Sequence, residues 1–203
     1  MKPVRELLVR NPHWTYRLFF AVLGFGLTAG TSGFFAPKYL QDLDEWTPAG
    51  VATLTVVGGA FATVGSPLTG WLSDRFDRTL ITIAFTALFG LTGVALYSLT
   101  GILAPALWII LTFHILGTEV TTTTYSTELF PTRYRSTATG ARQVLSTLAA
   151  ILGLSAVSAL YLVFDSNWIA ISVVCLFSLV APWIVWLLLP ETAGRKLEEI
   201  SPN

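Results

Sequence analysis

The chain has 203 residues, of which 53% are hydrophobic and 12% are charged, and its mean hydropathy is +0.66. Twelve basic and twelve acidic residues cancel to a formal net charge of zero. This balance excludes an ordinary soluble domain and gives no support for nucleic-acid binding, so we expect an all-α protein embedded in a lipid bilayer.

Six apolar stretches are long enough to cross the membrane, because a helix needs about 20 residues to traverse about 30 Å of hydrocarbon. They lie at about 18–36, 49–72, 80–100, 105–126, 137–163 and 168–189. The first is not a cleavable signal peptide, because it follows a polar-rich segment, is too long and lacks a clear cleavage site. The expected organisation is an N-terminal segment 1–17, a six-helix membrane domain 18–189 and a tail 190–203.

Basic residues fall almost entirely in one alternating set of loops. Eleven of the twelve lie before span one, after span two, after span six, or in the region where span four ends and span five begins. Arg142 belongs to this last group. Only Lys38 lies in the opposite set. Because cationic segments near span ends stay in the cytoplasm, both termini are predicted to be cytoplasmic, in a plasma or inner membrane.

Polar residues are shared unevenly among the six spans. Spans three and six carry no charge, which is typical of outer supporting helices. Spans one, two, four and five hold hydroxyl, amide and ionisable groups that are candidates to line a shared cavity, among them Thr31 and Ser32 in span one and Gln143 in span five. The glycines of spans one and two are better explained by close helix packing than by a site.

Glu119 in span four is the main candidate for handling protons or substrate. It lies about 13 Å along the helix from Glu128, at 1.5 Å per residue. Thr122, Thr123 and Ser126 share its face of the helix. A charge at this depth is costly, so Glu119 is predicted either to serve function or to be a structural carboxyl bonded to nearby hydroxyls.

A second polar face of the same span holds His114, Thr118, Thr121 and Tyr125, rotated by about 140° from the first. The two faces cannot both point at one small substrate. Either one lines a cavity while the other meets a neighbouring helix or a second subunit, or the helix is distorted. His114 and Tyr125 are candidate pathway residues, with hydrogen bonding inside the bundle as the alternative for His114.

Three loop motifs resemble those of the major facilitator superfamily, in its sugar-porter-like branch of metabolite and proton symporters. "GWLSDRFDRT" at 70–79 is similar to the family's G-x-L-(S/A)-D-R-x-G-R-(R/K) loop, with Asp77 in place of the glycine and Thr79 in place of the last base. "ELFPTRYRSTATG" at 128–140 and "LPETAGRKLEEI" at 189–200 are similar to the corresponding loop and tail signatures. Their order and spacing resemble the carboxy-terminal half, helices seven to twelve.

The resemblance implies six transmembrane helices arranged as two inverted three-helix repeats, half of a major facilitator fold. It also implies a cytoplasmic charge network that latches the cytoplasmic helix ends in the outward-open state, with Asp74 also accepting from backbone amides at the start of span five. The residues carried over to this network are Asp74, Arg75, Arg78, Glu128, Arg133, Arg135 and Glu191.

The expected function is therefore that of one half of an alternating-access secondary transporter. Its partners would be the bilayer, a small organic solute, H⁺ and a second six-helix half, supplied by a second copy, a separate chain or the rest of a longer protein. A non-transporting membrane subunit and a six-helix channel remain alternatives. No enzyme motif, cofactor site or metal-ligand spacing is evident.

The substrate class is constrained only weakly. The resemblance implies glutamines and an asparagine in helix seven of a typical sugar porter, and residues 21–40 contain neither amide residue, which argues against a hexose. A proton-coupled carrier of a small organic solute is the preferred interpretation, and charge pairing of Glu119 with a cationic solute is the second.

Overall fold

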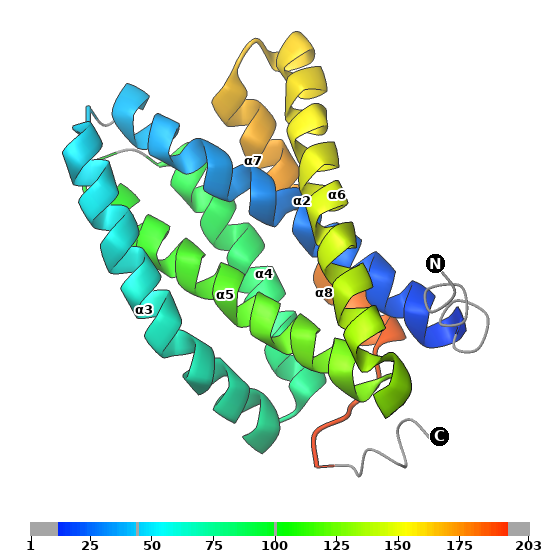
Figure 1. Cartoon of the computed structure of the whole chain (residues 1–203). Helices are drawn as coiled ribbons and strands as arrows, with labels where there is room; N and C mark the ends of the chain where they lie inside the picture. Colours follow the sequence, from blue (N-terminus) through cyan, green and yellow to red (C-terminus); the bar gives the residue numbers. More distant parts are fainter. Residues whose placement is uncertain (1–11, 44, 100, 195–203) are drawn as a thin grey trace.

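The computed structural model describes residues 12–43, 45–99 and 101–194, and within them all regular structure is helical. Successive spans run along the bundle in opposite directions (Figure 1). The elements are α2 (Pro12–Leu43), α3 (Pro48–Arg75), α4 (Arg78–Ser98), α5 (Ala104–Glu128), the 3₁₀ turn η1 (Thr132–Tyr134), α6 (Arg135–Phe164), α7 (Asn167–Phe177) and α8 (Val180–Leu188). The expected segments up to residue 11 and beyond residue 194 lie outside the described residues.

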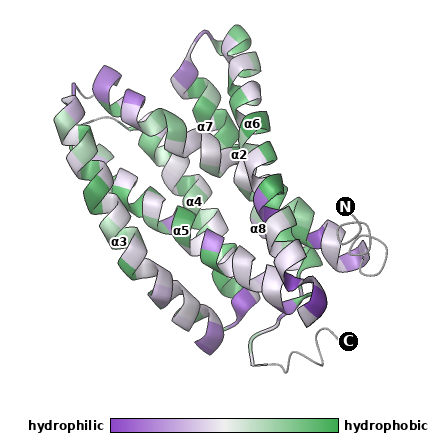
Figure 2. Ribbon diagram, in the orientation of Figure 1, coloured by the Kyte–Doolittle hydropathy of each residue, from purple (hydrophilic) through white to green (hydrophobic). Residues whose placement is uncertain are grey.

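The prediction of six spans is confirmed, because six helical segments are long and apolar enough to cross a membrane. Helices suit this setting because every backbone group finds its partner within its own segment. Their hydroxyls are also satisfied locally. Thr55, Thr63 and Ser66, for example, each donate to the carbonyl four residues earlier. Hydrophilic residues gather at helix ends, and apolar residues dominate the middle of the bundle (Figure 2).

Helix starts follow local capping chemistry. Thr47 accepts from Gly50 N at 3.1 Å before α3, and Pro48 occupies the first turn, where its missing N–H costs nothing. Asp77, which replaces a glycine of the resembled motif, accepts from Leu80 N at 2.9 Å and caps α4. The departure from the motif thus has a local structural role.

The last predicted span, 168–189, is two helices rather than one. Between α7 and α8 the backbone hydrogen bonds follow the 3₁₀ pattern, in which each N–H donates to the carbonyl three residues earlier. Leu179 N donates to Leu176 O, and Ala181 N donates to Ser178 O. Pro182 explains the break, because it has no N–H for the carbonyl four residues earlier. The first span also differs from the predicted 18–36, since α2 continues over 32 residues.

Small residues bring α2 and α6 into close contact. A Cβ added to Gly26 would lie 2.8 Å from Ala149 Cβ, and one added to Gly30 would lie 2.3 Å from Ala150 Cβ. On the α6 side, a Cβ on Gly153 would lie 1.9 Å from the carbonyl oxygen of Leu27. The predicted packing role of the span-one glycines therefore matches their surroundings at Gly26 and Gly30, and this crossing positions α6 beside α5.

Candidate functional site

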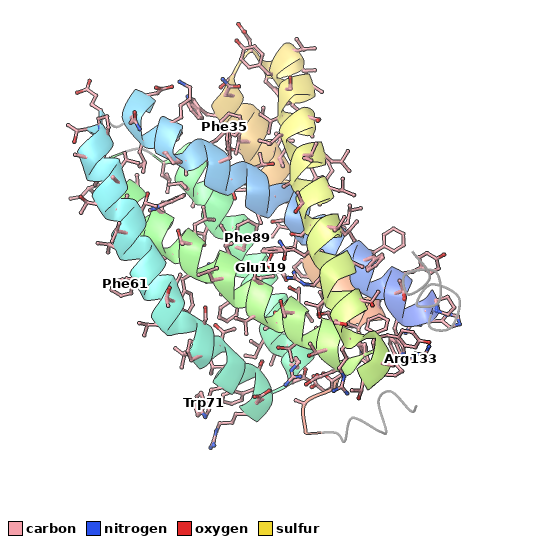
Figure 3. All side chains as sticks on the ribbon, in the orientation of Figure 1. Phe35, Phe61, Trp71, Phe89, Glu119 and Arg133 are labelled. Atoms are coloured by element: carbon pink, nitrogen blue, oxygen red, sulfur yellow. The ribbon has the colours of Figure 1, made fainter. Side chains whose placement is uncertain are left out.

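An open hollow of about 300 Å³ lies where α2, α5 and α6 approach one another. Its lining residues are Gly26, Ala29, Gly30, Ile115, Glu119, Ser146, Thr147 and Ala150. Small side chains on α2 and α6 leave this space, and Glu119 from α5 is the charged group on its wall. Figure 3 shows Glu119 about midway along the bundle, on α5 near α2 and α6.

Glu119 is not a lone carboxylate, because Arg142 of α6 pairs with it. Arg142 Nη1 lies 2.8 Å from Glu119 Oε2, and Arg142 Nη2 donates to Gln143 Oε1 at 3.0 Å. The arginine side chain is 5% exposed and the glutamate side chain 30%. The site is therefore an ion pair whose carboxylate faces the hollow and whose guanidinium lies behind it.

Sequence reasoning did not single out Arg142 as a site residue. It lies inside the predicted span 137–163, and an arginine within a span needs a partner in the protein. That signal was available, but the identity of the partner was not, because Glu119 lies 23 residues away on another helix.

The other candidate pathway residues are distributed around the bundle. Thr122 is buried and donates to Thr118 O at 2.8 Å, whereas Thr123 accepts at its carbonyl from Ser126. Thr31 donates to Leu27 O at 2.8 Å, and Ser32 donates to Ala29 O at 3.4 Å. None of these four hydroxyl residues lines the hollow. Gln143 is connected to the Glu119–Arg142 pair by accepting a hydrogen bond from Arg142.

The second polar face of α5 meets α4. His114 Nδ1 lies 3.4 Å from Thr92 Oγ1, and the imidazole packs edge-on against Phe85. Tyr125 Oη lies 3.0 Å from Thr79 Oγ1. Of the arrangements left open by the sequence, the structure has Glu119 on the hollow and the His114 face against a neighbouring helix.

Charged residues form a cluster at the end of the bundle where α3 meets α4. Arg78 pairs with both Asp74 and Glu128, and its side chain is 4% exposed. Glu191 in the tail accepts from Thr79 N at 2.9 Å and from Ala193 N at 2.5 Å. These contacts join α3, α4, α5 and the segment after α8.

Hydrogen bonding perturbs two carboxyl groups of this cluster. Burial raises the pKa of Glu191, but hydrogen bonds from Asp77 and from backbone amides outweigh this effect and lower the pKa to about 2. The hydrogen bond shared with Glu191 raises the pKa of Asp77, and burial adds to the effect. Glu191 accepts from Thr79 N at the start of α4, where the helix dipole favours negative charge.

The remaining cations of the predicted network make other contacts. Arg75 lies over the ring of Trp71 at 5.7 Å, and Arg133 lies over Tyr134 at 5.5 Å. Arg135 Nε donates to Phe130 O at 3.2 Å. Arg78, not Arg75, is the arginine held between Asp74 and Glu128. Asp74 accepts from Arg78.

No group of three His, Cys, Asp or Glu side chains suited to a metal ion occurs among the residues that the structure describes. The residues at the hollow supply the Glu119–Arg142 ion pair, the Gln143 amide and the hydroxyl groups of Ser146 and Thr147.

Comparison with known proteins identifies the family. Residues 18–201 match the model of the Major Facilitator Superfamily. This chain belongs to that superfamily. Its fold is similar to the inward-open xylose transporter XylE from E. coli, with a TM-score of 0.65 and 18% sequence identity. The alignment covers 88% of this chain and 48% of the XylE chain, so the superfamily member described here spans about half the length of that transporter. No match was found among curated proteins.

Proposed function

We propose that this chain provides six of the twelve helices of a secondary transporter that moves a small organic solute by alternating access, coupled to protons. The observation that supports the proposal most directly is the Glu119–Arg142 pair at the hollow between α2, α5 and α6. Ionisable residues inside membrane spans are expensive and usually mark a substrate or proton route. Family membership supports transport over the alternatives of a channel or an enzyme.

The charged cluster at the bundle end fits the role of a conformational latch. Arg78, Asp74 and Glu128 tie α3, α4 and α5 together, and Glu191 ties the tail to α4. A latch of about 1–3 kcal/mol is enough to shift a two-state equilibrium substantially. With the basic loops on the cytoplasmic side, as the charge pattern predicts, the cluster and both termini face the cytoplasm.

The decisive experiment is solute-driven proton movement in proteoliposomes. The chain is reconstituted alone and together with an amino-terminal six-helix half, and the internal pH is followed after solute addition. Wild type should acidify or alkalinise the lumen, and Glu119→Gln should abolish the pH change. The exposed Glu45 is the matched control, because Glu45→Gln should leave the signal intact.

Unaltered proton coupling in Glu119→Gln would remove that residue from the mechanism. Absence of transport in every combination, with a folded complex, would instead favour a membrane subunit that moves nothing.

A further inference from the structure

The Glu119–Arg142 pair leaves donors of the guanidinium free for another acceptor. Arg142 Nη1 is taken by Glu119, and Nη2 is held only by the neutral oxygen of Gln143. Nε is buried and has no partner. Gln143 itself is exposed in this chain. The guanidinium thus has an unsatisfied edge that suits a carboxylate, which accepts two parallel N–H bonds.

The charge at the hollow is zero when the pair is intact. The lining residues from α2 are Gly26, Ala29 and Gly30, which carry no charge, and those from α6 are small or hydroxylic. His114 on α5 turns to Thr92 of α4. The charged groups of α3 and α4 that adjoin α5 belong to the Arg78 cluster at the bundle end. Glu119 and Arg142 therefore set the local electrostatics.

We propose that Arg142 binds the carboxylate of a small monocarboxylate solute, and that Glu119 takes up the coupled proton. This inference rests on the proposed transport function and adds the substrate class to it. The solute carboxylate occupies the Nε and Nη2 edge of Arg142 after Gln143 moves away. Its negative charge beside Glu119 draws a proton from water onto the Glu119 carboxylate.

Charge balance explains why proton and solute move together. The empty site holds Arg142⁺ and Glu119⁻, and the loaded site holds Arg142⁺, neutral Glu119 and the solute anion. Both sum to zero. The anion without the proton gives a net charge of −1, and the proton without the anion gives +1, by counting these groups. Uncompensated charge inside a membrane bundle is strongly disfavoured, so the two neutral forms are the ones that switch conformation.

The same pairing disfavours the cationic solute that a lone Glu119 had suggested. A cation would compete with Arg142 for one carboxylate, leaving two positive charges beside it. A neutral solute brings no charge to offset a proton on Glu119. Charge balance therefore gives no reason for its binding to depend on pH.

Three probes of similar shape test the proposal: benzoate, benzamide and benzylammonium, with charges of −1, 0 and +1. Their binding to the purified full chain in detergent is measured by titration at about pH 6 and about pH 8, where benzoate stays ionised. Benzoate should bind alone among the three, and about tenfold or more tightly at the lower pH, because one proton is taken up with it.

Variants separate the two roles. Glu119→Gln mimics the protonated form, so benzoate should bind with the same affinity at both pH values. Arg142→Gln should lose benzoate binding. That variant leaves the Glu119 carboxylate unpaired, which could by itself disturb the site. The double variant Glu119→Gln/Arg142→Gln removes both charges, keeps the site neutral and should also fail to bind benzoate. Arg17→Gln is the control that removes a cation elsewhere and should behave as wild type.

The proposal is overturned if wild type binds none of the probes, prefers benzamide or benzylammonium, or binds benzoate equally at both pH values. Benzoate binding by the folded double variant would also overturn it. Binding in detergent is measured separately from transport. Intact benzoate binding without any uptake would therefore count against the transport function alone, whereas uptake of a neutral solute without benzoate binding would count against this inference alone.

Discussion

Arg78 is the single side chain on which the charged cluster at the bundle end depends. It is almost fully buried and contacts two carboxylates, whereas Arg75 is exposed and lies over Trp71. We predict that Arg78→Gln lowers the free energy of unfolding by about 2 kcal/mol or more, because it leaves the partly buried Glu128 without its cation. Thermal unfolding in detergent, followed by tryptophan fluorescence, measures this loss.

Arg75→Gln removes the same charge from the neighbouring surface and should change stability by no more than about 0.5 kcal/mol. Arg78→Gln/Glu128→Gln should recover part of the loss, because both members of the pair are then neutral. Equal effects of the two single arginine variants would show that the cluster has no special energetic role.

The contact between α2 and α6 is the element packing on which the hollow depends. Gly153 lies against the α2 backbone, and an added Cβ would meet Leu27 O at 1.9 Å and Thr31 Oγ1 at 2.4 Å. Gly153→Ala should therefore cost about 1–3 kcal/mol, since backbone atoms cannot rotate away. The helices would separate, moving Arg142 relative to Glu119. Thermal unfolding and benzoate titration both report the change.

Gly140→Ala is the control in the same helix, because no heavy atom lies within 4 Å of the new Cβ. It should be neutral or stabilise by about 0.5–1 kcal/mol, as expected when alanine replaces glycine in a helix. If both variants behaved alike, the close approach of α2 and α6 would not limit stability.

For the molecule as a whole, α3 and α6 are the helices with the least cover. In their most apolar segments 28% and 17% of residues are buried, compared with 39–44% in the other four spans. Phe61 and Trp71 project outward from α3 (Figure 3). Small and polar residues also face outward on these helices, among them Thr55 on α3 and Ser158 on α6. We therefore expect a second six-helix half to cover α3 and α6.

Single cysteines test this docking in native membranes, in a chain whose buried Cys175 is replaced by alanine. Cysteines at Thr55 and Ser158 should link to the second half through a reagent about 10 Å long, the usual spacing of packed helices. A cysteine at Leu91, exposed on α4, should not link. A chain that transported solute while strictly monomeric would contradict the requirement for two halves.

Local sequence patterns were sufficient for the number, order and helical nature of the spans. A run of about 20 apolar residues in hydrocarbon must satisfy its own backbone, and a helix does so without help from distant residues. Capping at Thr47 is equally local. The break before Pro182 also had a local signal, which a hydropathy window averages away.

The partners of the buried charges depended on packing between helices. Glu119 was found from its depth in span four, but its pairing with Arg142 follows from how α6 lies across α2 and α5. Likewise, Arg78 lies one turn from Asp74 in sequence, yet its contact with Glu128 joins α4 to α5. Hydropathy is a property of each segment alone, whereas an ion pair between helices depends on the rotation and crossing of two segments, which no single segment encodes.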